Sequence, residues 1–303
     1  MTRISPLWFV PLLAACVKPP EAPDKLEELC GFIYEHFRDE DPAALESAVT
    51  KLDTWLTDNF AATQEGYTVD DLDDNAVAPL DAPKVDISNL AGAAVVTDID
   101  HSVYALTKTI LTTDPRVVYN STYTLYDREW ITDIDCFVEG FCEEARAYTH
   151  SVSDWPLNMT VGVHLYQDYR WVDGELGESM IQRTWLDGPA EVTGFNLSVD
   201  AQYYMAVNIP QEDGGLHRLQ AMWVVAEIGD ASVPEAAALD LVIDSMRGED
   251  VTLTYYLDSQ EFIEEEGRGG QFKGGSCSHA PVGAGLGVSL AGLLLARRRR
   301  AKA

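Results

Sequence analysis

Hydrophobic residues near the start of the chain recur at the spacing of a helix. Between residues 26 and 37 they follow the i, i+3, i+4 rule that lines up one helix face, and a second stripe runs through residues 45–60. Asp41 and Pro42 are typical of a helix start, with a capping residue before a first-turn proline. We therefore predict a helical hairpin within residues 17–62, with its apolar stripe buried against the rest of the protein.

After about residue 93, the pattern changes to an alternation rich in β-branched and aromatic residues, which predicts strands. Gaps of hairpin length between the segments favour an antiparallel sheet. Residues 63–87, rich in aspartate, are predicted to form an acidic loop, and residues 88–260 a β-rich domain. The predicted strands cover residues 117–126, 146–152, 159–166, 179–185, 191–199, 202–209 and 218–228.

A late helix is predicted between Pro234 and Gly248, because the apolar positions between them stand close to helical spacing. A last strand is predicted over residues 251–257. The predicted fold class is therefore α+β. It consists of an N-terminal helical hairpin, a largely antiparallel β-sheet domain and a late C-terminal helix.

The order of these elements has a known counterpart. Residues 93–119 are predicted to form a strand, a turn and a helix, before successive strands and the late helix. That order resembles the helix-grip (START-like) architecture, in which a curved sheet wraps a long C-terminal helix around a ligand cavity; the predicted last strand departs from it. The resemblance implies a mainly apolar cavity, of roughly 300 Å³ or more for a lipid-sized ligand. In a plain two-layer domain the same side chains would pack solidly. The side chains expected to face the helix are Tyr203, Met205 and Val207, or Met222 and Val224.

The first sixteen residues predict export. Arg3 is followed by an apolar stretch that ends at Cys16 and is too short to span a bilayer. The residues Leu13-Ala14-Ala15-Cys16 match the lipobox of bacterial lipoproteins. The resemblance implies that residues 1–16 are a lipoprotein signal and that Cys16 is the lipidation site. An ordinary signal peptide with an incidental cysteine is the alternative.

The end of the chain predicts a second membrane signal. Residues 280–296 carry no charge, and as a helix they would cover roughly 25 Å, at the short end of what crosses a bilayer. Arg297, Arg298, Arg299 and Arg300 follow, and such a cluster stays cytoplasmic. A Gly-rich linker (261–276) and Cys277 precede this stretch. The arrangement resembles the MYXO-CTERM sorting signal. This implies that residues 277–303 are a sorting signal, that a membrane protease removes its helix, and that the region of Cys277 is the recognition and anchoring point. A buried hydrophobic helix with a basic tip is the alternative.

Composition agrees with an exported, folded domain. The net charge is −29 over 303 residues, and the two end segments contribute six basic residues and no acidic ones, so the body carries about −35. Such a surface repels nucleic acid. The expected partners are the membrane, through the lipid and the C-terminal anchor, together with a signal peptidase and a sorting protease. The expected location is the cell envelope, at the outer membrane or cell surface.

Three cysteines remain in the body of the chain. Cys136 and Cys142 are six residues apart with Gly140 between them, which predicts a local disulfide in an oxidising compartment. Cys30 stands on an apolar helix face, where a free cysteine behaves as a small hydrophobe. It is predicted to be unpaired, or to compete for one of the other two.

No catalytic, cofactor or metal motif stands out. The stretch DDLDDN at residues 70–75 could offer oxygen ligands to Ca²⁺, but it lacks the glycine and the bidentate glutamate of an EF-hand loop, and a solvated acidic loop is the simpler interpretation. The two TDID stretches, with Asp98/Asp100 and Asp133/Asp135, are further candidates. We predict no cofactor and no metal.

The sequence therefore predicts an exported, membrane-anchored surface protein that is not an enzyme. A module that binds a lipid or another hydrophobic ligand is one alternative. An envelope hydrolase is the other, because a serine–histidine–aspartate site depends on spatial proximity and leaves no motif in the sequence.

Overall fold

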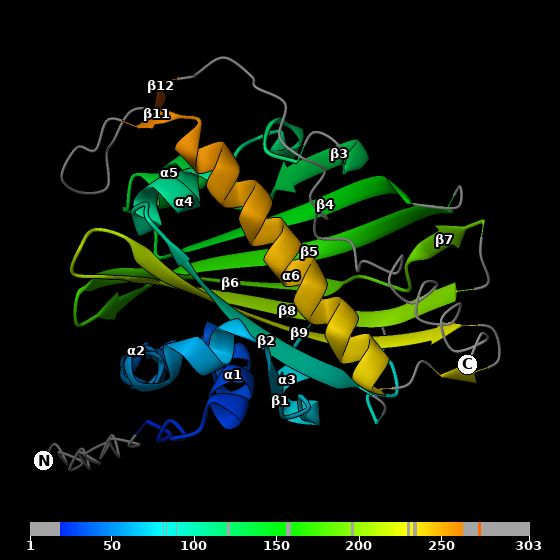
Figure 1. Cartoon of the computed structure of the whole chain (residues 1–303), viewed down its shortest axis with the longest axis horizontal. Coiled ribbons are helices and arrows are strands. Elements are labelled where there is room, and N and C mark those ends of the chain that lie inside the picture. The colour runs from blue at the N-terminus through cyan, green and yellow to red at the C-terminus, as the bar shows by residue number, and fades with distance from the viewer. Residues whose placement is uncertain are drawn as a thin grey trace, which may run out of the picture.

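The N-terminal hairpin is present as predicted. The computed structural model describes residues 19–262 and 272–273, except 81, 83, 89, 120–121, 156–158, 195–196, 229–230 and 233–234. Helix α1 (Leu26–Glu35) continues into a 3₁₀ turn, η1 (His36–Arg38), and α2 (Ala43–Gln64) follows. The apolar stripes of both helices are buried. They pack together against one face of a large sheet (Figure 1).

Ten strands form that sheet, and all of its pairings are antiparallel. The order is β1-β2-β9-β8-β6-β5-β4-β3, while β7 pairs with β5 and β10 with β9. The predicted fold class, α+β with an antiparallel sheet, is confirmed. The strand bounds are β1 (Tyr67–Val69), β2 (Ala91–Ile99), β3 (Tyr123–Trp130), β4 (Glu144–Trp155), β5 (Met159–Gly174), β6 (Gly177–Leu186), β7 (Glu191–Thr193), β8 (Leu197–Pro210), β9 (Leu216–Ile228) and β10 (Ala231–Ser232), with a separate pair β11 (Glu261–Phe262) and β12 (Phe272–Lys273).

Three predicted boundaries were wrong. The acidic loop 63–87 contains β1, which pairs with β2, and a short helix, α3 (Asp74–Val77). The predicted strand 117–126 begins later, because a 3₁₀ turn, η2 (Pro115–Val117), occupies its start. The predicted strand 191–199 is two strands, since β7 prolongs the edge of β6 along β5 and β8 belongs to the next hairpin.

The late helix is longer than predicted. Helix α6 (Glu235–Asp258) runs through Gly248 and through residues 251–257, where we predicted a strand. The β-branched and aromatic residues there suggested a strand, but the buried positions Val242, Met246, Leu253 and Leu257 keep helical spacing, so packing on the sheet decides the local structure. Two shorter helices, α4 (Val103–Ile110) and α5 (Ile134–Val138), lie beside its C-terminal half (Figure 1).

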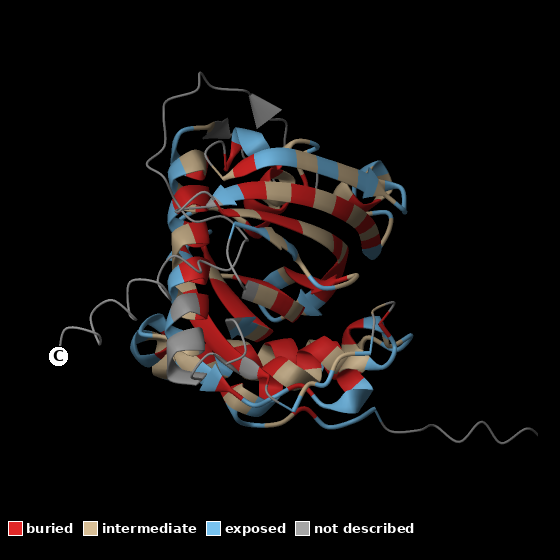
Figure 2. Cartoon of the chain, turned by 90° about the vertical axis from the view of Figure 1, so that its right-hand side faces the viewer, coloured by how far each residue is buried: buried red, intermediate tan, exposed pale blue. Residues whose placement is uncertain are grey.

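The sheet is covered on both faces. It curves, with α6 across one face and the hairpin of α1 and α2 against the other (Figure 2). Met222 and Val224 face α6, as predicted. Tyr203, Met205 and Val207 do not, because they pack with α1 and α2 on the opposite face. Neighbours in a strand alternate between faces, and Tyr204 is the side chain that turns to α6.

A disulfide closes the segment around α5. Cys136 and Cys142 are bonded, with their Cα atoms 5.3 Å apart. Cys30 is a free, fully buried cysteine, and burial raises the pKa of its thiol far above the ordinary value. The predicted signal residues lie outside the described part of the chain: Cys16, Cys277, Arg297, Arg298, Arg299 and Arg300. Within the described part, no helix is long and apolar enough to cross a membrane.

We expect Gly92→Ala to destabilise the fold, because β2 passes directly over a buried indole. A Cβ at this position would lie 2.4 Å from Cδ1 of Trp223 and 2.9 Å from Val69. Trp223 is fully buried and donates a hydrogen bond from Nε1 to the Asp70 carbonyl at 2.8 Å, so it has little room to move. Overpacking of this kind costs about 1–3 kcal/mol.

Urea denaturation followed by tryptophan fluorescence measures this loss. Gly188→Ala is the matched control, because a Cβ there meets nothing within 4 Å. Equal stability of the two variants would contradict the close approach of β2 to Trp223.

Candidate functional site

A small pocket lies between α6 and the sheet, on the face that curves around the helix. Its walls come from α4, from the turn after it, from β3, β5 and β6, and from α6. The centre of a water molecule could occupy about 20 Å³ within it, which is room for about one or two waters. The lining residues are Thr109, Ile110, Pro115, Tyr119, Tyr123, Tyr126, Arg128, Gln167, Tyr169, Gln182 and Glu249.

The wall of this pocket is rich in polar side chains. It contains four tyrosines, two glutamines, one arginine and one glutamate. Sequence reasoning missed these residues because they come from several elements that lie far apart along the chain. Their shared location appears only once the strands are paired.

Two polar groups in the wall have no partner among the described residues. Tyr169 is fully buried, and its hydroxyl makes no hydrogen bond there. Burial raises the pKa of Tyr169 to about 12, so its phenol keeps its proton at neutral pH. Arg128 donates from its terminal nitrogens to the Ile110 and Thr112 carbonyls and to the Tyr126 hydroxyl, at 2.7–3.2 Å, but its Nε has no partner.

A buried ion cluster adjoins the pocket. Arg218 on β9 donates from Nε to Asp250 at 2.9 Å and approaches Glu249 at 3.4 Å. All three side chains are almost completely buried. Arg218 also donates to the Asn208 carbonyl oxygen at 2.9 Å and to the Tyr204 hydroxyl at 2.8 Å. The cluster therefore joins α6 to the two central strands β8 and β9.

Glu249 belongs both to the cluster and to the pocket wall. Desolvation by burial raises its pKa to about 7, although Arg218 and a hydrogen bond with Tyr119 oppose the shift. Burial also raises the pKa of Asp250. The charge of the pocket wall therefore changes near neutral pH.

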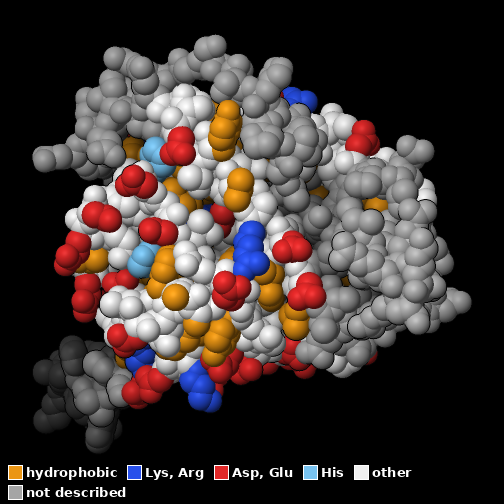
Figure 3. Space-filling model, viewed as in Figure 1, with side chains coloured by type: hydrophobic (Ala, Val, Ile, Leu, Met, Phe, Trp, Pro, Cys, Tyr) orange, Lys and Arg blue, Asp and Glu red, His pale blue; other side chains and the backbone are white. Residues whose placement is uncertain are grey.

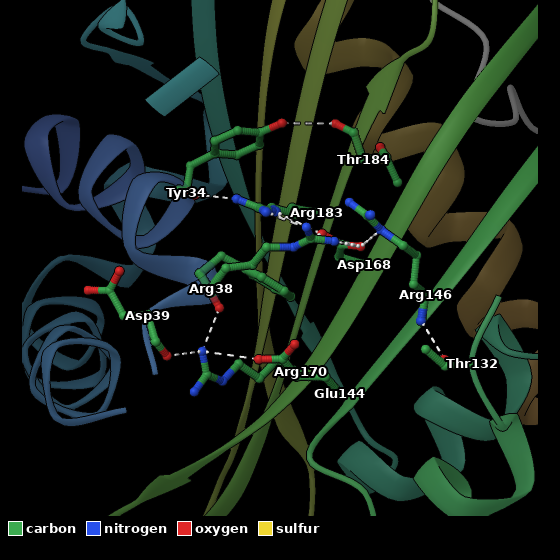
Figure 4. A network of polar contacts seen from close by, with 11 residues as sticks. Tyr34, Arg38, Asp39, Thr132, Glu144, Arg146, Asp168, Arg170, Arg183 and Thr184 are labelled. Atoms are coloured by element: carbon green, nitrogen blue, oxygen red, sulfur yellow. Dashed lines mark hydrogen bonds and ion pairs between the residues drawn. The ribbon is translucent and has the colours of Figure 1, made fainter. Parts of the chain in front are cut away.

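A second polar network lies on the opposite face of the sheet (Figure 4). Asp168 on β5 is buried and accepts hydrogen bonds from Arg38 in η1, Arg146 on β4 and Arg183 on β6, at 2.8–3.2 Å. Arg183 also donates to the Tyr34 carbonyl of α1 at 3.0 Å. One carboxylate thus joins the helical hairpin to three neighbouring strands.

The same face carries two histidines side by side. His150 and His164 are register partners on β4 and β5, and their rings stack 4.3 Å apart. Tyr148 contacts His164 at 3.3 Å and donates to Asp187 at 2.8 Å. Within the described parts of the chain, no group of three or more His, Cys, Asp or Glu side chains is arranged to hold a metal ion.

Two of the three aspartate-rich stretches supply helix caps. Asp73 of DDLDDN accepts hydrogen bonds from the backbone N–H groups of Asn75 and Ala76 at the start of α3. Asp133 of the second TDID stretch caps α5 in the same way. Short polar side chains at these positions satisfy the free N–H groups of a helix start.

The predicted disulfide lies behind the pocket wall rather than in it. Cys136 is part of α5, and Phe137 next to it packs on Trp171 and Tyr169, with ring centroids 5.6 Å and 6.4 Å apart. The bond therefore restrains the segment that supports the Tyr169 ring.

No family model and no curated protein matches the sequence. Similar solved structures include the STAR-related lipid transfer protein (fragment 25–204) from Xanthomonas axonopodis, which is 14% identical, with a TM-score of 0.38 over 58% of this chain and 90% of that one. A START superfamily protein from Mycobacterium smegmatis is 8% identical, with a TM-score of 0.37 over 55% of this chain and 97% of that one. Human StAR-related lipid transfer protein 5 is 7% identical, with a TM-score of 0.37 over 72% and 96%. Identities this low concern the fold alone.

The buried glutamate predicts that stability falls as pH rises. In the unfolded chain, Glu249 releases its proton near pH 4.5, whereas in the folded chain it keeps the proton up to about pH 7. Folded protein binds more protons in this window, so its free energy of unfolding decreases across it, by at most about 1.4 kcal/mol per pH unit for one group. Glu249→Gln should make the decrease shallower; part of it remains because Asp250 contributes with the same sign.

Urea denaturation at several pH values between 4.5 and 7 measures this slope. Glu212→Gln, in the exposed turn between β8 and β9, is the control and should keep the wild-type slope. An unchanged slope in Glu249→Gln would show that the glutamate is already ionised at low pH.

The network on the opposite face predicts a large effect of a small substitution. Asp168→Asn keeps the shape of the side chain but removes the negative charge that Arg183, only 3% exposed, shares with Arg38 and Arg146. Breaking a buried ion pair costs about 3–5 kcal/mol, and we expect a loss of about 3 kcal/mol in urea denaturation. Asp24→Asn removes an exposed pair with Lys51 and should cost less than about 1 kcal/mol. Similar losses in both variants would contradict the role of Asp168.

Proposed function

We propose that this protein is exported, held in the cell envelope by its end segments, and binds a small amphipathic molecule between α6 and the curved sheet. It carries out no reaction of its own. The observation that carries the binding role is the pocket, where the Tyr169 hydroxyl and Arg128 Nε have no partner among the described residues. Buried polar groups are normally hydrogen-bonded, and a ligand supplies the missing acceptor.

The inner face of β5 supports an amphipathic ligand rather than a wholly polar one. Side chains that point to α6 along this strand change from apolar to polar, through Val163, Leu165, Gln167 and Tyr169. Val163 packs on the apolar cluster under α6 and is only half-buried. A polar end group would occupy the pocket, and an apolar part would follow the strand toward Val163.

The size of the pocket sets a condition on binding. Room for one or two waters accommodates an end group but not a whole lipid. The apolar part would have to separate α6 from the inner face of β5. Leu165 of β5 and Val242 and Met246 of α6 belong to one apolar cluster, and these side chains have no directional hydrogen bonds to break.

Histidine chemistry does not favour the hydrolase alternative. His36 faces Asp39 at 2.7 Å and His101 faces Asp258 at 2.9 Å, and both carboxylates are well exposed. His150 and His164 stack on each other, with their ring centroids 4.3 Å apart. Hydrolysis of this type needs a base between a nucleophile and an orienting acid in a substrate cleft.

The negative charge of the surface disfavours nucleic-acid binding. The face crossed by α6 shows many acidic and few basic side chains (Figure 3). Export and anchoring rest on the two terminal signals in the sequence, the lipobox at Cys16 and the sorting signal at Cys277 with its arginine cluster. Two acyl chains on one cysteine give firm membrane attachment.

Labelling and extraction test this proposal together. In bacteria that express the full chain and are fed radioactive palmitate, we expect label in the protein and sedimentation with membranes. Cys16→Ala should abolish the label, while the matched control Cys30→Ala, a substitution in the core, should retain it. Organic extracts of the purified protein should contain a bound amphiphile by mass spectrometry. A cytoplasmic product with an intact Met1 would contradict the location, and an extract free of amphiphiles would contradict the binding role.

A further inference from the structure

The pocket wall contains hydrogen-bond donors that have no acceptor among the described residues. Arg128 Nε and the Tyr169 hydroxyl have no partner in the described part of the chain. Tyr126 accepts a bond from Arg128 at 2.7 Å, which leaves the proton of its own hydroxyl to be donated. Donors of this kind, one of them charged, match the oxygens of an anion.

We propose that this pocket binds a carboxylate, with Arg128 and Tyr169 as the residues that hold its two oxygens. The inference rests on the proposed function and assigns the end group of its ligand. The ligand is then a carboxylic acid with an apolar body, such as a fatty acid.

Volume favours a carboxylate over a phosphate. A space for about one or two water-sized atoms accepts the two oxygens of a carboxylate, and the four oxygens around a phosphorus need more. A carboxylate also carries one negative charge, and Arg128 supplies one positive charge.

The second buried arginine is not available to the ligand. Arg218 already donates to Asp250, Asn208, Tyr204 and Glu249. Its charge is matched by Asp250 at 2.9 Å. Within the described part of the chain, Arg128 donates to two carbonyl oxygens and a hydroxyl rather than to a carboxylate, so its positive charge remains for a bound anion.

Titration of the purified full chain with octanoate, 1-octanol and octyl phosphate tests the inference, with isothermal calorimetry as the measurement. These probes share one apolar body and differ in the end group. We expect octanoate to bind most tightly. Tyr169→Phe should weaken octanoate binding about tenfold and leave octanol binding unchanged, because one hydrogen bond to a charged group is worth roughly 1.5–3 kcal/mol.

Tyr169→Phe also separates binding from folding. It removes a buried hydroxyl without a described partner, so thermal stability should be equal or higher. Arg128→Lys, which keeps the charge but loses the Nε donor, should weaken octanoate binding as well. Tyr255→Phe, on the exposed side of α6, is the matched control and should bind octanoate like the wild type.

Each outcome bears on a different statement. Equal binding of octanoate and octanol, unchanged by Tyr169→Phe, would overturn the carboxylate assignment and leave the binding role intact. Tighter binding of octyl phosphate would also overturn the assignment. Failure of all three probes would overturn both the assignment and the proposed binding role.

Discussion

Burial on both faces is the constraint on which the rest of this fold depends. A sheet with helices on each side removes its central strands from water, and any charged group there needs a partner. Asp168 meets this requirement on the side of the hairpin, through three arginines. Arg218 meets it on the side of α6, through Asp250 and Glu249. Each cluster also joins a helical layer to the sheet, so the polar groups fix how the layers are placed.

The pocket lies where this pairing stops. Arg218 donates to several partners in its cluster, whereas Tyr169 and Arg128 beside it keep donor atoms that have no acceptor among the described residues. The surrounding structure holds both in place, since Phe137 packs on the Tyr169 ring and the backbone after α4 holds Arg128. A group held in this way pays little conformational entropy when a ligand arrives, which favours binding. The packing that holds these unpaired donors in place therefore also keeps the pocket wall rigid.

Local sequence patterns predicted the helices and strands better than they predicted which of these elements pack against each other. The spacing of apolar residues predicted the hairpin, most strands and the late helix. The short separation of Cys136 and Cys142 predicted their disulfide. Residues 251–257 show the limit, because their side chains favour a strand and only the fit of Leu253 and Leu257 to the sheet makes them helical. Tyr203 shows a second limit. Alternation along a strand predicts that neighbouring side chains point to opposite faces of the sheet, but it does not predict which of them faces α6.

The pocket could not have been predicted in the same way. Arg128, Tyr169 and Glu249 come from an edge strand, a central strand and the last helix, and no short-range pattern links them. One signal was available, because Arg218 alternates in β9 with the same parity as Met222 and Val224, which face α6. A charged residue at an inward position of a strand indicates a buried partner elsewhere, and here that partner was Asp250 on the helix.

The acidic surface limits how an anionic ligand could reach this pocket. A body charge of about −35 repels a carboxylate in solution, but salt screens that repulsion beyond about 8 Å. Nine residues, 17–25, separate Cys16 from the start of α1, a reach of about 30 Å when extended. A lipidated Cys16 would therefore keep the domain within reach of a bilayer, where amphiphiles are concentrated. Inside the pocket, the end group of a ligand would lie close to Arg128, where the attraction between opposite charges is strongest. The acidic exterior and a pocket for an anion are thus compatible in a tethered protein.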